Sequence, residues 1–573
     1  MSTRRQRSRS DREGGPRGCV PVAAQRLLAE LVRQPWGQVS PSEYETARLV
    51  ALAPWLPGNA ARVDWLLARQ RADGGWGPPG GYGVVPTLSA TDALLATALA
   101  GEDGRRPHPS AEPARAADAG LRALAAAAGS DVPDTPAVDL IAPALADRIG
   151  RRLARLAQWP GAGLDAWRDA APPPLPAGLS GKRWAGLRGL VAAGRPLPEK
   201  LLHALEVLGP DAPRAAGVRP CGPGAVGASP AATAAWLGAP GRGDPAATAT
   251  WLDGPGGGDP AATAAWPARS GQDRSARDYL ATVRRQHAEL APCATPITVF
   301  ERAWVLSDLL RAGVPVTVPS VLTRSLAAAL GPDGAATGPG LPADADTTAV
   351  VLHALTLLGR PAPPAALLGY DRGDHFSTWS AEDGASVTTN AHVLDALGRA
   401  ADHRYASAAR RVAVWLVDRQ QPDGRWTDRW HASPYYATGC AAVALAEYAA
   451  PAESGPAVDR AVEWVLASAR EDGGWGGAGS TSEETAYAVR ILLTGPPGRT
   501  GVRAALRRGV KFLISHPDGA RQGPSLWHDK DLYRPTAVVR AAVLSSIHRG
   551  LLALRDATLP AVPPAGADVI RTG

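Results

Sequence analysis

Apolar residues recur at three- and four-residue spacing through most of the chain. The spacing is clear in residues 61–70 (ARVDWLLARQ), 300–313 (FERAWVLSDLLRAG) and 406–420 (ASAARRVAVWLVDRQ). It is typical of amphipathic helices, and few stretches show the apolar–polar alternation of strands. The pattern predicts an all-α protein built from many paired helices.

Three turns between such helices share the sequence Asp-Gly-x-Trp. They lie in residues 70–77, 420–426 and 471–476. Each supplies a glycine for the turn, an Asp that can bond nearby backbone and a Trp that can pack on the preceding helix. Asp-Gly pairs are common in ordinary turns, but three copies with the same Trp indicate a repeated helix–turn–helix unit. This repetition predicts an α/α barrel.

Two stretches interrupt the helical pattern. Residues 101–120 are rich in Pro, Gly and charge, which predicts a surface loop. Within residues 229–267, the segment PAATAAW or PAATATW begins at Pro230, Pro245 and Pro260, a period of 15 residues. We interpret this repeat insertion as one original copy with a tandem expansion that carries no chemistry.

Composition limits the class of protein. The 573-residue chain is 45% hydrophobic and 20% charged, as globular proteins are, and no segment reads as a transmembrane span. Residues 1–20 are basic without a following signal sequence, and we expect a disordered tail. The four cysteines lie far apart, without a zinc motif or disulfide framework, which favours a reducing cytoplasm. The net charge of +7 is spread along the chain, which argues against a nucleic-acid partner.

The stretch LPADADTT (341–348) places two carboxylates, Asp344 and Asp346, directly before an apolar helical run. Spacing alone favours a helix cap, because Asp and Thr side chains bond free N–H groups there. A second interpretation is an acid at a dry pocket, where burial and a neighbouring carboxylate let a carboxylic acid keep its proton. Such an acid could protonate an alkene.

The order of these and other motifs resembles the bacterial class II diterpene cyclases, which make copalyl-type diphosphates from geranylgeranyl diphosphate. The resemblance runs from about residue 21 to 555, and DADTT (344–348) is one of nine blocks in family order. The other blocks are residues 34–57, 70–95, 227–238, 295–306, 386–397, 426–438, 472–493 and 526–544.

The resemblance implies two α-helical barrels, called γ and β, with the active site between them. We expect the γ-type domain at residues 21–290, the β-type domain with the DADTT motif at 291–560, and a flexible tail at 561–573. No DDxxD or NSE-like motif occurs in the sequence. This agrees with an enzyme that protonates the far end of its substrate and leaves the diphosphate attached.

By the same resemblance, Asp346 would be the general acid and Asp344 would support it. Thr347 stands where the family's DxDD pattern has a third acid. Thr347 can still make a hydrogen bond but cannot carry a second negative charge near Asp346.

Cyclisation passes through carbocations, which aromatic faces can stabilise while water is excluded. Ordinary core packing is the competing interpretation for each aromatic residue. The candidates are Trp304, Trp379, Trp426, Trp430, Tyr435, Tyr436 and Tyr487.

The resemblance also implies a role in termination for His203, in the segment PEKLLHALE. Cys293 or Ala294 stands where the family has its Asn partner, so the terminating base stays open, with His392 and His431 as alternatives.

The diphosphate requires cations. Lys530 resembles part of a family WxGK element, and Arg540 follows one face further along; either could bind phosphate oxygens. Mg²⁺ is expected with the diphosphate, and Glu206 and Asp211 are candidate ligands, although a solvated helix face is the favoured interpretation of these two acids. A downstream class I diterpene synthase would be the pathway partner.

Three other classes remain as alternatives: a squalene–hopene-type triterpene cyclase, a protein prenyltransferase subunit and a non-catalytic α-toroid binding module. For the main interpretation, the resemblance implies a bicyclic product with a labdane skeleton or a rearranged halimane or clerodane skeleton.

Overall fold

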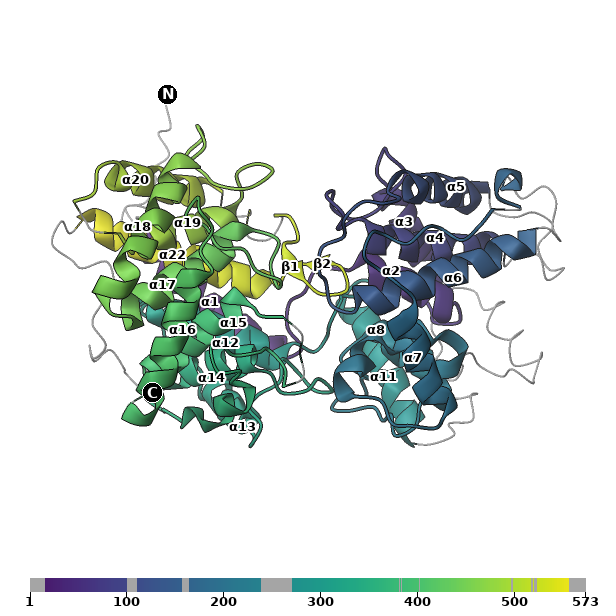
Figure 1. Cartoon of the computed structure of the whole chain (residues 1–573), viewed down its shortest axis with the longest axis horizontal. Helices are drawn as coiled ribbons and strands as arrows, with labels where there is room; N and C mark the ends of the chain where they lie inside the picture. The colour runs from purple at the N-terminus through teal and green to yellow at the C-terminus, as the bar shows by residue number, and fades with distance from the viewer. Residues whose placement is uncertain are drawn as a thin grey trace, which may run out of the picture.

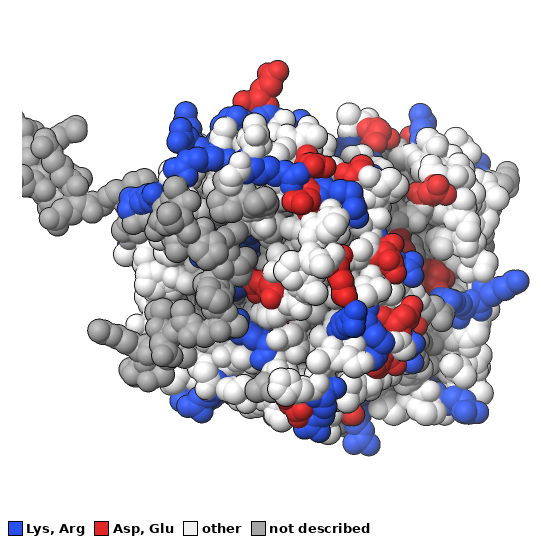
Figure 2. Space-filling view, turned by 60° about the vertical axis from the view of Figure 1, so that its left-hand side comes forward, with Lys and Arg blue, Asp and Glu red and all other residues white. Residues whose placement is uncertain are grey.

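The computed structural model places two helical domains side by side, joined where the short strands β1 and β2 lie (Figure 1). The structure describes residues 16–99, 111–156, 164–168, 170–238, 271–380, 382, 384–400, 402–495, 498–516, 519 and 523–555. In this part of the chain, the all-α prediction is confirmed apart from these two-residue strands. On the face seen in Figure 2, basic and acidic side chains are intermixed.

The C-terminal domain is an α/α barrel. Its inner helices contact one another in chain order, and the last closes the ring by packing against the first. These helices are α12 (Thr298–Arg311), α14 (Ala345–Leu357), α15 (Val387–Gly398), α17 (Pro434–Tyr448), α19 (Ser482–Leu492) and α22 (Thr536–Arg555). The outer layer is formed by α13 (Ser320–Ala329), α16 (Ala406–Asp418), α18 (Pro451–Ala467), α20 (Val502–Ser515) and the 3-10 helices η5 (Pro364–Tyr370) and η6 (His403–Tyr405).

The N-terminal helix α1 (Pro16–Arg33) also belongs to this C-terminal barrel. It packs against α22, and Leu27, Leu28 and Leu31 lie in the same apolar core as the barrel helices. The prediction that the γ-type domain begins at residue 21 was therefore wrong. The disordered tail was predicted to extend to residue 20, but residues 16–20 are helical. Residues 1–15 lie outside the described residues.

The N-terminal domain forms a second ring with its own apolar core. Its inner members are α2 (Glu43–Leu52), α4 (Val84–Leu99), α6 (Val138–Leu156), the 3-10 helix η4 (Glu199–Arg214) and α8 (Pro230–Leu237), and α8 closes the ring against α2. Around it lie α3 (Asn59–Arg69), α5 (Ala111–Ala126), η3 (Asp165–Trp167), α7 (Lys182–Ala192) and α11 (Gly271–Gln286).

The structure describes part of each stretch that interrupts the helical pattern of this domain. The expected loop at 101–120 was wrong for residues 111–120, which start helix α5; residues 101–110 lie outside the described residues. The first repeat copy, from Pro230, is helix α8, capped by Ser229, whose hydroxyl accepts a hydrogen bond from the Ala232 N–H. The copies from Pro245 and Pro260 lie outside the described residues.

The three Asp-Gly-x-Trp turns are built alike. Trp76, Trp426 and Trp475 are each 0% exposed. Each indole N–H donates to a carbonyl of the preceding helix at 2.7–2.8 Å, and each backbone N–H donates to a threonine hydroxyl of the following helix. The repeat therefore clamps successive helices together, and Trp426 serves the fold here.

A short antiparallel hairpin connects the domains. β1 (Trp527–His528) pairs with β2 (Leu532–Tyr533). Its consecutive residues His528, Asp529 and Lys530 bond to Tyr82, His203 and Glu206 of the N-terminal domain. Since the sequence lacked a strand pattern here, this interdomain contact was not predicted.

The sequence was expected to contain no segment that could span a membrane, but helix α22 is long and apolar enough to do so. It has the length for a span and an 18-residue window with mean hydropathy of 1.4. However, 56% of that window is buried, because α22 packs among α1, α12, α19 and α20. Its apolar character follows from its place in the barrel core.

Candidate active site

A cavity of about 850 Å³ lies between the two domains, within the usual size range of ligand sites. The N-terminal domain contributes apolar side chains such as Val138, Leu187 and Leu201, and the C-terminal domain contributes aromatic ones. An apolar cavity of this size suits a hydrocarbon chain.

The carboxyl groups of the DADTT motif line this cavity at the start of α14. Asp344 is the N-cap of that helix, because its Oδ1 accepts the Thr347 N–H at 2.6 Å. Burial raises the pKa of Asp344 to about 8, although the hydrogen bond from Thr347 lowers it. Asp344 thus caps the helix and keeps its proton at neutral pH.

Asp346 has a different partner. Its Oδ1 lies 2.6 Å from Nδ1 of His392 on α15. Burial opposes a charged imidazole, but the carboxyl of Asp346 and then Cys440 raise the pKa of His392 well above its usual value. A charged His392 stabilises the carboxylate that remains after Asp346 gives up a proton. The neutral Asp344 adds no second negative charge.

Thr347 also lies on the cavity, and its hydroxyl is 3.2 Å from that of Thr337. The described structure therefore brings all three predicted residues of the motif to one site. Their proposed chemical roles stay predictions.

Three of the predicted aromatic residues line the cavity: Trp304, Trp379 and Trp430. Trp379 and Trp430 meet edge to face, with ring centroids 5.2 Å apart. Sequence reasoning missed Phe300 and Trp527, which also line it and pack against each other 5.5 Å apart. Phe300 begins a predicted helix and Trp527 precedes the Lys530 motif, but no local signal shows that both face one cavity.

The other aromatic candidates do not line the large cavity. Tyr435 packs against Trp464 in the barrel wall. Tyr436 accepts the Trp304 indole N–H at 3.0 Å and stacks on His431. His431 is buried beside Glu483, and Tyr487 lies near it. These residues support the aromatic wall from behind.

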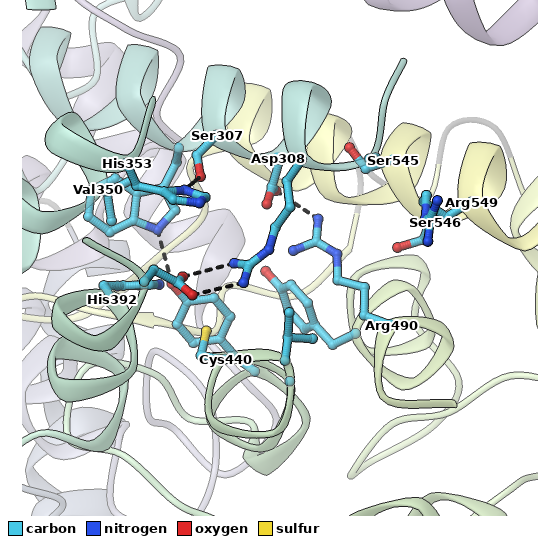
Figure 3. A pocket seen from close by; sticks show the side chains of 18 of the residues that line it. Ser307, Asp308, Val350, His353, His392, Cys440, Arg490, Ser545, Ser546 and Arg549 are labelled. Carbon is cyan, nitrogen blue, oxygen red and sulfur yellow. Dashed lines mark hydrogen bonds and ion pairs between the residues drawn. The ribbon is translucent and has the colours of Figure 1, made fainter. Parts of the chain in front are cut away.

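A smaller cavity of about 110 Å³ lies inside the C-terminal barrel, and His392 is one of its lining residues (Figure 3). Several of its lining residues are polar and bond to one another: Arg311 forms two 2.8 Å hydrogen bonds with Asp395, and Ser307 bonds to His353. His392 borders this cavity whereas Asp346 borders the large one. The pair thus lies between two separate cavities.

The predicted diphosphate ligands lie elsewhere. The Lys530 Nζ is enclosed at the domain interface, where it bonds to Glu206 and Ser229 at 2.9 Å and to Glu45. Arg540 pairs with Glu30, joining α22 to α1. Neither cation lines the cavity, and each pairs with acids in its own surroundings. The cations that do line it are Arg183, Lys200 and Arg429.

The predicted metal ligands do not form a metal site. Glu206 accepts the Tyr44 hydroxyl at 2.7 Å and pairs with Lys530, while Asp211 pairs with Arg188 and Arg214. Across the described ranges, no group of three or more His, Cys, Asp or Glu side chains is arranged to hold a metal ion. Glu206 and Asp211 therefore do not fit Mg²⁺ in this arrangement.

His203 lines the cavity and forms a close pair with Asp529, Nε2 to Oδ1, at 2.8 Å. Of the two residues predicted to replace the Asn partner, Ala294 lines the cavity, whereas Cys293 turns to Asp531, 2.5 Å away. Asp529 was missed in the sequence, where it stands among the charges of WHDKDLY without a distinguishing signal.

Fold and site together define a class of protein, a two-barrel helical enzyme that presents a carboxyl group to an apolar cavity. Residues 378–535 match the family described as the squalene-hopene cyclase C-terminal domain. The chain is 42% identical to an ent-copalyl diphosphate synthase of Streptomyces sp. (strain KO-3988) over 92% of this chain and 95% of the relative. It is 40% identical to labda-7,13-dienyl diphosphate synthase of Streptomyces clavuligerus, over 97% of each.

Among solved structures, ent-copalyl diphosphate synthase from Streptomyces platensis superposes with a TM-score of 0.82 at 44% identity, over 94% of this chain and 100% of that one. The chain belongs to the bacterial class II diterpene cyclases.

Proposed function

We propose that this enzyme cyclises geranylgeranyl diphosphate to a bicyclic copalyl-type diphosphate and retains the diphosphate. The observation that carries the proposal is the Asp346 carboxyl, placed on an apolar interdomain cavity and bonded to His392. The names of the relatives, an ent-copalyl and a labdadienyl diphosphate synthase, support this substrate class.

Asp346 is the group that we assign as the acid. It gives its proton to the terminal alkene of the substrate, while His392 stabilises the carboxylate that forms. Asp344 stays neutral and holds the first turn of α14 in place. Thr347 contributes a neutral hydroxyl near the acid.

The aromatic wall then contains the carbocation. Trp304, Phe300 and Trp527 lie on the cavity, so their ring faces can stabilise positive charge and exclude water. The diphosphate would contact the lining cations Arg183, Lys200 and Arg429, in place of Lys530 and Arg540.

We also propose a metal ion, a location and a pathway partner for this enzyme. Mg²⁺ would reduce the charge of the diphosphate, although Glu206 and Asp211 are committed to other partners. We place the enzyme in the cytoplasm and expect a class I diterpene synthase to use its product.

The test is incubation with geranylgeranyl diphosphate and Mg²⁺, followed by phosphatase treatment and mass spectrometry. A bicyclic C20 alcohol is expected, and EDTA should reduce its yield. Unchanged geranylgeranyl diphosphate together with conversion of squalene would refute the proposal and favour a triterpene cyclase.

A further inference from the structure

The interdomain hairpin carries a carboxyl group, Asp529, into the cavity wall. Its Oδ1 accepts the Lys530 backbone N–H at 2.7 Å and faces Nε2 of His203 at 2.8 Å. Its Oδ2 receives no hydrogen bond from any described residue, and the side chain keeps 12% of its surface accessible. One carboxylate oxygen is therefore open to a bound molecule.

His203 has no free nitrogen with which to accept a proton. Its Nδ1 lies 2.6 Å from the carbonyl oxygen of Gly227, which can only accept, so Nδ1 carries a hydrogen. Burial opposes the charged ring, but Asp529 raises the pKa of His203 above its usual value. Burial likewise opposes the Asp529 carboxylate, but His203 lowers the pKa of Asp529 overall. The hydrogen bonds and the directions of both shifts favour the imidazolium–carboxylate form of the pair.

We propose that Asp529 is the base that ends cyclisation, and that His203 is a positioning residue that keeps Asp529 ionised and oriented. This inference rests on the proposed function. In the step, a C–H bond next to the ring cation breaks and its proton forms an O–H bond with Oδ2 of Asp529. The electron pair of that C–H bond becomes the product alkene. After product release, the proton passes to water and the carboxylate is restored.

The assignment agrees with the position of Asp529 relative to the acid. Asp346 and Asp529 lie on the same cavity but come from different elements, α14 and the hairpin. Tyr533 also lines the cavity. Burial raises its pKa most, and the nearby charges of Asp529 and Asp346 raise it further, so both carboxyl groups lie close to Tyr533. Initiation and termination thus use separate carboxyl groups. Placement matters more than base strength for taking a proton from a carbocation.

The substitution Asp529→Asn tests the assignment, because it removes the negative charge and keeps the shape. We expect cyclisation to continue, with water capturing the cation that is no longer deprotonated. The hydroxylated fraction of the bicyclic C20 product should rise at least about tenfold. Mass spectrometry after phosphatase treatment measures this fraction, and ¹⁸O-labelled water identifies the origin of the new hydroxyl.

The matched control is Asp531→Asn. Asp531 stands two residues further along the same hairpin, bonds to Ser42, Tyr44 and Cys293, and does not line the cavity. This control should keep the wild-type ratio of alkene to hydroxylated product. Circular dichroism shows whether both variants fold.

His203→Gln tests the positioning role separately. It retains a neutral donor, so Asp529 should lose its proton less readily than in the wild-type enzyme. We expect the alkene fraction of this variant to fall as the pH is lowered towards about 5, whereas the wild-type fraction should stay level over the same range. A level fraction in both proteins would overturn the positioning role.

Three results would overturn the assignment of Asp529: an unchanged product ratio in Asp529→Asn, the same altered ratio in Asp531→Asn, or the loss of all cyclised product in folded Asp529→Asn. Failure of the proposed function would instead appear in the wild-type enzyme, which would then leave geranylgeranyl diphosphate uncyclised.

Discussion

At Asp344 and Asp346, two carboxyl groups one residue apart have different tasks because their hydrogen-bond partners differ. Asp344 accepts the N–H that opens α14, and Asp346 meets an imidazole from the neighbouring helix. Capping and acid catalysis, which compete as interpretations of the sequence, are thereby divided between two residues.

Asp346→Asn should reduce cyclisation by at least about 100-fold, the usual contribution of a general acid, with little change in the melting temperature. Asp344→Asn is the comparison variant, because Asn caps a helix about as well as Asp and should preserve α14. We expect it to lose less activity. Product formation from geranylgeranyl diphosphate measures both, and an active Asp346→Asn beside an inactive Asp344→Asn would exchange the two roles.

The Asp346–His392 pair should also make stability depend on pH. Because the folded-state pKa of His392 is raised, its contribution to the free energy of unfolding is fully present below about pH 6.5, the unfolded value, and is lost as the pH rises towards the folded pKa. The difference in unfolding free energy between wild type and His392→Gln should therefore become smaller from pH 6 to pH 9. The pH dependence of this difference should correspond to the titration of about one group. Urea unfolding at several pH values measures it, and a difference that grows with pH would contradict the pairing.

At the scale of elements, the hairpin and its ion cluster join the two barrels. The Lys530 Nζ is fully buried against Glu45 and Glu206, and the first of these acids also bonds to the start of α8. One side chain thus ties β1–β2 to two elements of the N-terminal domain. These bonds hold Lys530, which the sequence predicted as a diphosphate ligand, at the interface and outside the cavity lining.

Lys530→Met should destabilise the protein by about 3–5 kcal/mol, because it leaves buried acids without their counterion. Lys511→Met, at an exposed position of α20, is the control and should change stability by less than about 0.5 kcal/mol. Denaturant unfolding measures both. If Lys530 instead bound the diphosphate directly, its substitution would raise KM and leave the unfolding free energy unchanged.

At the scale of the whole molecule, the sequence was informative where the structure is local and repetitive. The helical period and the Asp-Gly-x-Trp turns predicted barrels, because each turn is closed by contacts within a few tens of residues, as at Trp426 and Leu416. The placement of α1 against α22 and the bonding of Asp529 to His203 could not be predicted this way. These contacts join segments more than 300 residues apart, and neither partner carries a local pattern that depends on the other.

The interdomain cavity leads to a prediction about binding. Because both domains line it, a ligand that fills it adds contacts across the interface and binds only the folded protein. Geranylgeranyl diphosphate should therefore stabilise the Asp346→Asn variant, which binds it without turnover, by about 2.7 kcal/mol at a hundred times Kd.

Inorganic diphosphate lacks the hydrocarbon chain and should stabilise the same variant much less, since the apolar walls supply most of the contact area. Thermal unfolding with each ligand measures the two shifts. Equal shifts would place binding at the lining cations Arg183, Lys200 and Arg429 alone. No shift with geranylgeranyl diphosphate would show that this cavity does not receive the isoprenoid chain.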